Sequence, residues 1–314
     1  MIATNIWLWV GFVGFILAML SLDLGVFHRS PHEVRPTEAA VWTGVWVVLA
    51  LVFAAGLLLD YGHDVSLTFV TGYVIEESLS VDNLFVILLI FQYFAVPKVC
   101  QHRVLFYGIL GALVMRGVFI GLGAVLIARF HWILFLFGAM LVVTGVRMAF
   151  KSGDDEFDGA ANPIVRLVHR TMPMSKEFEG KHFFIVEAGR RVATPLLLVL
   201  ILVEVTDLIF AIDSIPATFG VTTDPFLVFT SNIFAILGLR SLYFLLAAVV
   251  DRFYLLKYAL ALILTFVGVK MLGESFFQID IVLSLGIILG VLAAAVAASL
   301  VWPRRSGGNS TGKA

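Results

Sequence analysis

The chain has 314 residues, of which 61% are hydrophobic and only 14% are charged, and its formal net charge is −1. Soluble domains are about half apolar and about a quarter charged, so this composition excludes an ordinary soluble domain and indicates a polytopic membrane protein. The balanced charge gives no basic bias that would favour nucleic acid as a partner. Cys100 is the single cysteine, so the chain cannot form an internal disulfide.

Stretches of about 20 apolar residues are long enough to cross a lipid bilayer as helices. The sequence predicts an all-α polytopic membrane protein with about nine such helices. The predicted spans cover residues 5–27, 40–59, 67–95, 104–127, 131–150, 195–217, 226–250, 254–273 and 281–302. The first span lacks the basic flank of a cleavable signal peptide and is too long for one.

Lys and Arg residues concentrate in every second connection between the spans, and such residues mark the cytoplasmic side. The connections 60–66, 218–225 and 274–280 contain none, and 128–130 contains Arg129 alone. This alternation predicts an N-terminus outside the cell and a C-terminus in the cytoplasm. We expect a multi-pass protein of the inner (plasma) membrane, and the sequence leaves its oligomeric state open.

The spans divide the chain into six segments. They are two N-terminal helices (1–66), a first three-helix repeat (67–150), a cytoplasmic loop (151–193), a second repeat (194–273), a last helix (274–302) and a disordered tail (303–314). Within the loop we predict a short helix over 163–171 and a small hairpin over 182–194. The loop is either a structured linker or a docking site for a partner.

The two repeats are recognised by an acidic motif that occurs in spans 3 and 6. Glu76-x5-Asp82-Asn83 matches Asp207-x5-Asp213-Ser214. Further along, Arg116 matches Arg240, and residues 145–148 match 268–271. Span 3 enters from outside and span 6 from the cytoplasm, so the repeats over spans 3–5 and 6–8 are predicted to be inverted. Inverted repeats are common in secondary transporters, whose sites lie where the repeats meet.

Acidic residues within the membrane are the strongest functional signal in the sequence. The six are Glu76, Glu77, Asp82, Glu204, Asp207 and Asp213. Each Asp near the centre of a span costs about 2.5–3.5 kcal/mol. One interpretation is that they pair with Arg116 and Arg240 to hold the helices together. Two arginines cannot neutralise six carboxylates, so we expect other acids to bind a cation or a proton.

The polar groups near the acids are oxygen ligands. They include Asn83, Ser214 and, as a further candidate, Asn232, whereas no His or Cys lies near either motif. Oxygen-only sites suit hard divalent cations such as Mg²⁺, Ca²⁺ or Mn²⁺. The sequence therefore predicts a metal pathway made of Glu76, Asp82, Asn83, Glu204, Asp207, Asp213 and Ser214, with Glu77 as another possible member.

Helical geometry limits how these acids share an ion. Glu204 and Asp207 lie about 60° apart around a helix, whereas Asp213 lies about 180° from Glu204. Either the helix is interrupted between 207 and 213, or there are two separate sites. Because Pro216 removes a backbone N–H, we predict a broken or kinked span 6 and a similar disturbance near 78–83 in span 3.

Residues 67–86 (LTFVTGYVIEESLSVDNLFV) and 198–217 (LVLILVEVTDLIFAIDSIPA) resemble the two signature segments of the TerC/Alx family of integral membrane proteins. Residues 129–150 and 222–247 are also similar, so the likeness covers essentially the whole chain. The resemblance implies a transporter of the LysE-like group associated with Mn²⁺ efflux, with the matched acids in the metal pathway. Glu77 is outside the family motif.

These observations predict a secondary transporter that exports Mn²⁺ by alternating access, in exchange for protons, and neither an enzyme nor a protein with an organic cofactor. Asp82 and Asp213 would serve the inward-facing and outward-facing states in turn. Two alternatives stay open. The transported ion could be Ca²⁺ or Mg²⁺, or the protein could be a membrane partner that delivers metal to secreted enzymes or assists insertion.

Overall fold

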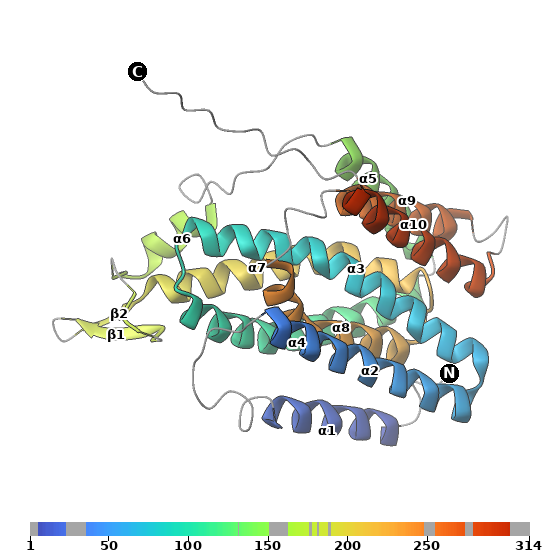
Figure 1. Ribbon diagram of the computed structural model, residues 1–314, viewed down its shortest axis with the longest axis horizontal. Coiled ribbons are helices and arrows are strands. Elements are labelled where there is room, and N and C mark those ends of the chain that lie inside the picture. Colours follow the sequence, from blue (N-terminus) through green and yellow to red (C-terminus); the bar gives the residue numbers. More distant parts are fainter. Residues whose placement is uncertain are drawn as a thin grey trace.

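The computed structural model describes residues 6–22, 36–130, 132–150, 163–175, 178–180, 182–187, 190–247, 255–273 and 279–301. In these residues the chain forms ten α-helices and one two-stranded sheet (Figure 1). The elements are α1 (Ile6–Leu22), α2 (Pro36–Tyr61), α3 (His63–Tyr93), α4 (Lys98–Arg129), α5 (Ile133–Phe150), α6 (Pro163–Thr171), β1 (Phe184–Glu187), β2 (Arg190–Ala193), α7 (Pro195–Phe219), α8 (Pro225–Ala247), α9 (Leu256–Gly273) and α10 (Ile281–Val301).

Six of the described helices are long and apolar enough to cross a membrane, namely α2, α4, α5, α7, α8 and α10. This supports the polytopic, helical class. α1 and α9 are apolar, but their apolar segments are shorter. α3 is 31 residues long and carries three acids between Tyr73 and Leu84. A helix overlaps each predicted range, but membrane crossing by all nine stays a prediction.

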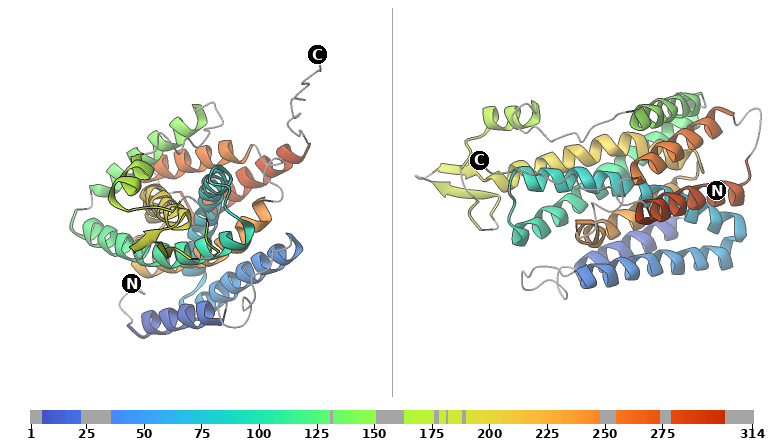
Figure 2. Two further views of the ribbon diagram at one scale, coloured as in Figure 1. Left: turned by 90° about the vertical axis from the view of Figure 1, so that its left-hand side faces the viewer. Right: turned by 45° about the horizontal axis from the view of Figure 1, so that its top comes forward.

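α8 lies at the centre of the bundle and contacts α2, α3 and α4. Its side chains from Thr230 to Leu239 are all buried, as expected for a helix that is apolar on every side. α1 and α2 cover one side of this centre, and α5, α9 and α10 group together on another (Figures 1 and 2). By contrast, α10 buries only Ser284, Ile288 and Ser299 among its described side chains, so most of its apolar surface faces outward.

Matching helices of the two predicted repeats pack against each other in opposite directions. The residue pairs that show this are Gly72–Thr218 and Asn83–Asp207 for α3 and α7, and Gln101–Tyr243 and Arg116–Asn232 for α4 and α8. Antiparallel matching helices are what an inverted repeat requires. The packing therefore supports the predicted repeat, which itself stays a prediction.

In the third matching pair, α5 and α9, the two backbones approach each other closely. A Cβ on Gly268 would lie 2.7 Å from the carbonyl oxygen of Gly138, and a Cβ on Gly145 would lie 2.7 Å from that of Ala261. Residue numbers rise along one helix as they fall along the other, so α5 and α9 are also antiparallel. Small residues allow this approach of two backbones within a membrane.

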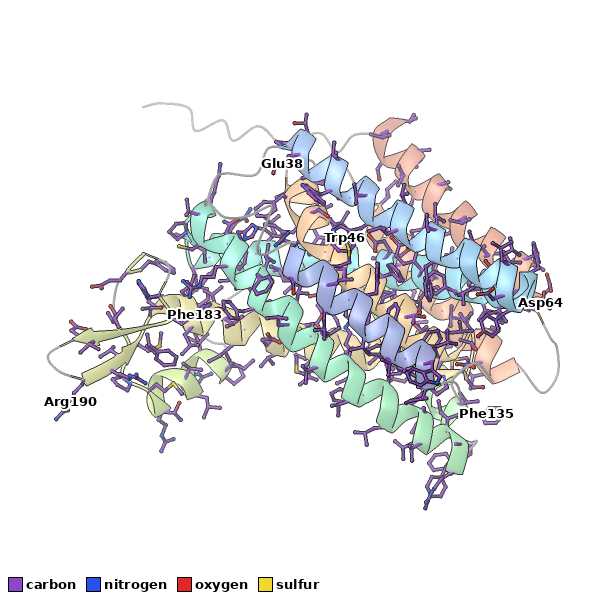
Figure 3. The ribbon with its side chains drawn as sticks, turned by 90° about the horizontal axis from the view of Figure 1, so that it is seen from below. Glu38, Trp46, Asp64, Phe135, Phe183 and Arg190 are labelled. Atoms are coloured by element: carbon purple, nitrogen blue, oxygen red, sulfur yellow. The ribbon has the colours of Figure 1, made fainter. Side chains whose placement is uncertain are left out.

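The predicted short helix and hairpin of the 151–193 loop are confirmed. α6 covers 163–171, and β1 pairs with β2 in antiparallel register from Phe184↔Ala193 to Glu187↔Arg190. The predicted turn residues 188–189 lie outside the described residues. Figure 3 shows Arg190 of this hairpin at one end of the molecule and Asp64, at the start of α3, at the opposite end.

The predicted break in spans 3 and 6 is wrong, whereas the kink given as its alternative stays a prediction. α3 is one helix from His63 to Tyr93, and α7 is one helix from Pro195 to Phe219 that includes Pro216. The helix continues only three residues beyond Pro216, so the proline disturbs little of it. A break in mid-span would also leave backbone groups without hydrogen bonds in hydrocarbon, which is costly. Of the two alternatives, the continuous helix leaves separate sites for Asp207 and Asp213, and these sites stay a prediction.

Candidate functional site

The site is built around the guanidinium of Arg116 on α4, whose residue is only 1% exposed. Its Nη2 donates to Asp207 Oδ1 at 2.9 Å and its Nε donates to Asp207 Oδ2 at 3.4 Å, so this pair is bidentate. Its Nη1 donates to Glu76 Oε1, to Asn232 Oδ1 at 2.7 Å and to Ser214 Oγ at 3.4 Å. Asn83 Nδ2 also donates to Asp207 Oδ1, at 2.9 Å. We call Arg116, Glu76, Asn83, Asp207, Ser214 and Asn232 the Arg116 cluster.

The spacing of the repeated motif explains why these residues meet. Glu76 and Asn83 on α3 are seven residues apart, as are Asp207 and Ser214 on α7. Seven residues are close to two helical turns, so each pair lies on one helix face. Asp82 and Asp213 each precede the last residue of their motif by one position, so their positions lie about 100° further around the helix. The motif thus encodes one shared face and a separate aspartate.

Asp213 confirms this separation. Its Oδ1 accepts a hydrogen bond from Thr144 Oγ1 of α5 at 3.2 Å, away from Arg116. Asp82 holds the matching position on α3, but its side chain lies outside what the structure describes. The conformational roles predicted for Asp82 and Asp213 therefore stay predictions.

Glu204 lies on α7 one turn before Asp207 and contacts a different part of α4. Its carboxylate lies directly against Gly111, where an added Cβ would overlap it. Its Oε2 is buried and has no hydrogen-bond partner among the described residues. Close to this region, a cavity of ≈ 20 Å³ is lined by Asn83, Asp207, Arg240 and apolar side chains of α3, α4, α7 and α8. That volume suits about one water molecule.

Glu77 is adjacent to Glu76 in sequence but lies on another face of α3. Its carboxylate is within 3.8 Å of the position a Cβ on Gly238 would take, next to Trp46. It therefore sits between α2, α3 and α8 and not in the Arg116 cluster. Arg240 lines a second small cavity together with Glu38 and His102, towards the start of α2 and α4.

The cluster is acidic and retains unused acceptors. If Glu76 and Asp207 are both ionised, two negative charges face the single positive charge of Arg116. Glu76 Oε2 and Asn83 Oδ1 are buried without a hydrogen-bond partner in the described part of the chain. Buried oxygens of this kind normally have a partner, so they are candidate ligands for a cation or a proton. However, no three His, Cys, Asp or Glu side chains among the described residues form a group that could hold a metal.

Of the predicted site residues, the structure thus joins Glu76, Asn83, Asp207, Ser214 and Asn232. It places Glu204, Asp213 and Glu77 in three other contacts. The sequence had left the role of Asn232 open, because a single amide in an apolar span carries no periodic signal. The sequence named Arg116 as a charge partner of the acids, and its ion pairs with Glu76 and Asp207 agree with that interpretation. Its contacts with Ser214 and Asn232 were not predicted, since they depend on how α4 packs against α7 and α8.

Residues 61–307 match the model of the "Integral membrane protein TerC family". The chain belongs to the TerC family. A Myxococcus xanthus relative, "Uncharacterized membrane protein STKORF319", is 51% identical over 95% of this chain and 93% of its own length. The Escherichia coli K12 "Putative membrane-bound redox modulator Alx" is 50% identical over 91% of both chains. No solved structure matches the chain significantly.

The TerC match begins at residue 61, so it includes every member of the Arg116 cluster and leaves α1 and nearly all of α2 outside it. A more distant relative, an "Uncharacterized membrane protein" of Rickettsia bellii, is 38% identical over 93% of this chain and 97% of its own. The relatives and the six apolar helices together identify an integral membrane protein, as the sequence predicted.

Proposed function

We propose that this TerC-family protein is a secondary transporter that exports Mn²⁺ from the cytoplasm in exchange for protons. The observation that carries the proposal is the Arg116 cluster. It holds two carboxylates, two amides and a hydroxyl from three helices, deep in the bundle, with buried acceptor atoms left over. Oxygen donors of this kind select hard cations such as Mn²⁺, Mg²⁺ or Ca²⁺. We assign the hairpin end of the molecule to the cytoplasm of a cell with an inner membrane.

The energetics favour exchange with a second ion. Moving two positive charges outward against an inside-negative potential costs about 4.6 kcal/mol per 100 mV. The sequence has no nucleotide-binding motif that would supply this energy from ATP. Protons and Mn²⁺ compete for the same carboxylate oxygens, so proton binding on one side and metal binding on the other can be exchanged. Antiparallel matching helices provide the arrangement in which two halves rock about a shared site.

Two other functions remain to be separated from this one. The protein could act on Ca²⁺ or Mg²⁺, or deliver metal to secreted enzymes as a membrane partner. The name of the E. coli relative, a membrane-bound redox modulator, indicates a redox role for that protein. A dithiol mechanism within this chain is excluded, because Cys100 is its only cysteine, is buried, and donates to the carbonyl oxygen of Gly180 at 3.1 Å.

The test is Mn²⁺ uptake into inverted vesicles, which expose the cytoplasmic face. We expect uptake to require an acidic vesicle lumen and to stop when a protonophore removes the gradient. Acidifying the outer medium should slow uptake, because protons then occupy the carboxylates that load Mn²⁺. Competition by excess Ca²⁺ or Mg²⁺ measures selectivity. Absence of Mn²⁺ flux in correctly folded protein would favour the delivery role.

A further inference from the structure

Arg116 occupies the position that a bound dication would need. Five oxygen atoms on four side chains accept hydrogen bonds from its guanidinium, and these four residues are Glu76, Asp207, Ser214 and Asn232. A hard dication holds its oxygens at about 2.0–2.6 Å. The guanidinium nitrogens already lie 2.7 and 2.9 Å from the oxygens of Asn232 and Asp207. The arginine and a metal ion therefore cannot occupy these oxygens together.

The positive charge of Arg116 stabilises the buried carboxylates of the cluster. Without any cation, the carboxylates of Glu76 and Asp207 would face each other in a dry interior, which is strongly unfavourable. Arg116 cancels one of the two negative charges, whereas a dication would cancel both. The cluster is thus occupied by its own cation in the described conformation, and with both carboxylates ionised it retains one negative charge that attracts another cation.

A second carboxylate is placed to receive the arginine when it leaves. Glu204 lies one turn from Asp207 along α7, about 4.5 Å in axial rise. Its carboxylate lies against Gly111 of α4, on the N-terminal side of Arg116, and its buried Oε2 has no hydrogen-bond partner among the described residues. Long side chains on a helix lean toward its N-terminus. Glu204 is therefore on the side to which the Arg116 side chain leans.

We propose that Arg116 is a tethered competitor of the transported cation, and that it moves from Asp207 and Glu76 to Glu204 when the cation binds. This inference rests on the proposed function and adds a residue that sets the affinity of the site. Because the arginine refills the site after the ion leaves, it also favours release. Glu204 then contributes to metal binding through Arg116 and is not itself a ligand in this step.

The test measures Mn²⁺ binding to the purified full-length protein in detergent, by isothermal titration, in a double-mutant cycle. We expect Arg116→Gln to tighten Mn²⁺ binding by about 10-fold, because its competitor is removed. We expect Glu204→Gln to weaken binding by about 10-fold in the wild type. In the Arg116→Gln variant, Glu204→Gln should alter Mn²⁺ binding by less than about threefold, because no arginine is present to move to Glu204.

Controls separate this inference from folding and from the proposed function. Arg147→Gln makes the same change of charge at an exposed position of α5 and should leave binding unaltered. Arg116→Lys keeps the charge without the planar fork, so its affinity should lie between those of the wild type and Arg116→Gln. Gel filtration and thermal unfolding verify that each variant is folded. In transport, Arg116→Gln should lower both KM and the maximal rate.

Three results would overturn the inference. If the wild type binds Mn²⁺ and folded Arg116→Gln and Arg116→Lys bind it no more tightly, Arg116 is not a competitor. If Glu204→Gln weakens Mn²⁺ binding equally in the wild type and in Arg116→Gln, Glu204 is a direct ligand. The proposed movement of Arg116 to Glu204 is then wrong. If neither the wild type nor any variant binds Mn²⁺, the proposed function fails together with the inference.

Discussion

Replacing Asp207 by Asn is expected to lower Mn²⁺ transport by about 100-fold, which corresponds to roughly 2.7 kcal/mol. Asp207 is buried, accepts the bidentate pair from Arg116 and also accepts from Asn83. An amide of the same shape removes one of two carboxylates from the cluster and leaves a buried arginine partly unpaired. Removing one partner of a buried ion pair costs about 3–5 kcal/mol, so lower stability is expected as well.

The measurement is initial Mn²⁺ uptake into proteoliposomes, normalised to folded protein by gel filtration. Asp60→Asn is the matched control, since Asp60 lies at the exposed end of α2. Asp213→Asn should reduce uptake too, because Asp213 belongs to the predicted pathway, although it leaves the Arg116 cluster intact. Wild-type rates in both Asp207→Asn and Asp213→Asn would show that the assignment of the site is wrong.

A single methyl group between α5 and α9 is expected to destabilise the protein by about 1–3 kcal/mol. In Gly268→Ala, the new Cβ would lie 2.7 Å from the Gly138 carbonyl oxygen and 2.8 Å from the backbone nitrogen of Val142. Both are backbone atoms, so no side-chain rotation relieves the clash and the two helices must separate. If α5 and α9 move as one unit during transport, the rate should fall as well.

Thermal unfolding in detergent tests this expectation, with Gly121→Ala as the control. Gly121 lies in a helix, and a Cβ there would meet nothing within 4 Å. Alanine is the better helix former by about 1 kcal/mol, so the control should be unchanged or slightly more stable. A Gly268→Ala variant as stable as its control would mean that the helices are not in close contact.

Much of the architecture could be predicted because it follows from local regularities. Long apolar stretches predict membrane helices, since a backbone in hydrocarbon must satisfy its own hydrogen bonds. The same principle explains why the predicted break near Pro216 was wrong. The short helix at 163–171 and the hairpin were also predictable, from a helical apolar pattern and from a turn between short strands.

The candidate site was predictable in part for the same reason. A seven-residue interval places Glu76 with Asn83, and Asp207 with Ser214, on one face of its helix whatever the rest of the fold does. The oxygen-only site for a hard cation was inferred from the absence of His and Cys near the acids, and it stays a prediction. The family was likewise recognisable from these two segments.

The side chains that lie between these faces of α3 and α7 come from other helices, and they depend on packing between segments that are far apart in sequence. Arg116 reaches the acids only because α4 packs against α3, α7 and α8 in one particular rotation, and the same packing brings in Asn232. It also turns Asp213 toward Thr144, Glu204 toward Gly111 and Glu77 toward Trp46. Periodicity along one helix gives the direction of a side chain but not its neighbour. For that reason the assembled helices were needed to show that Glu76 and Asp207 share one cluster whereas Glu77, Glu204 and Asp213 lie in separate contacts.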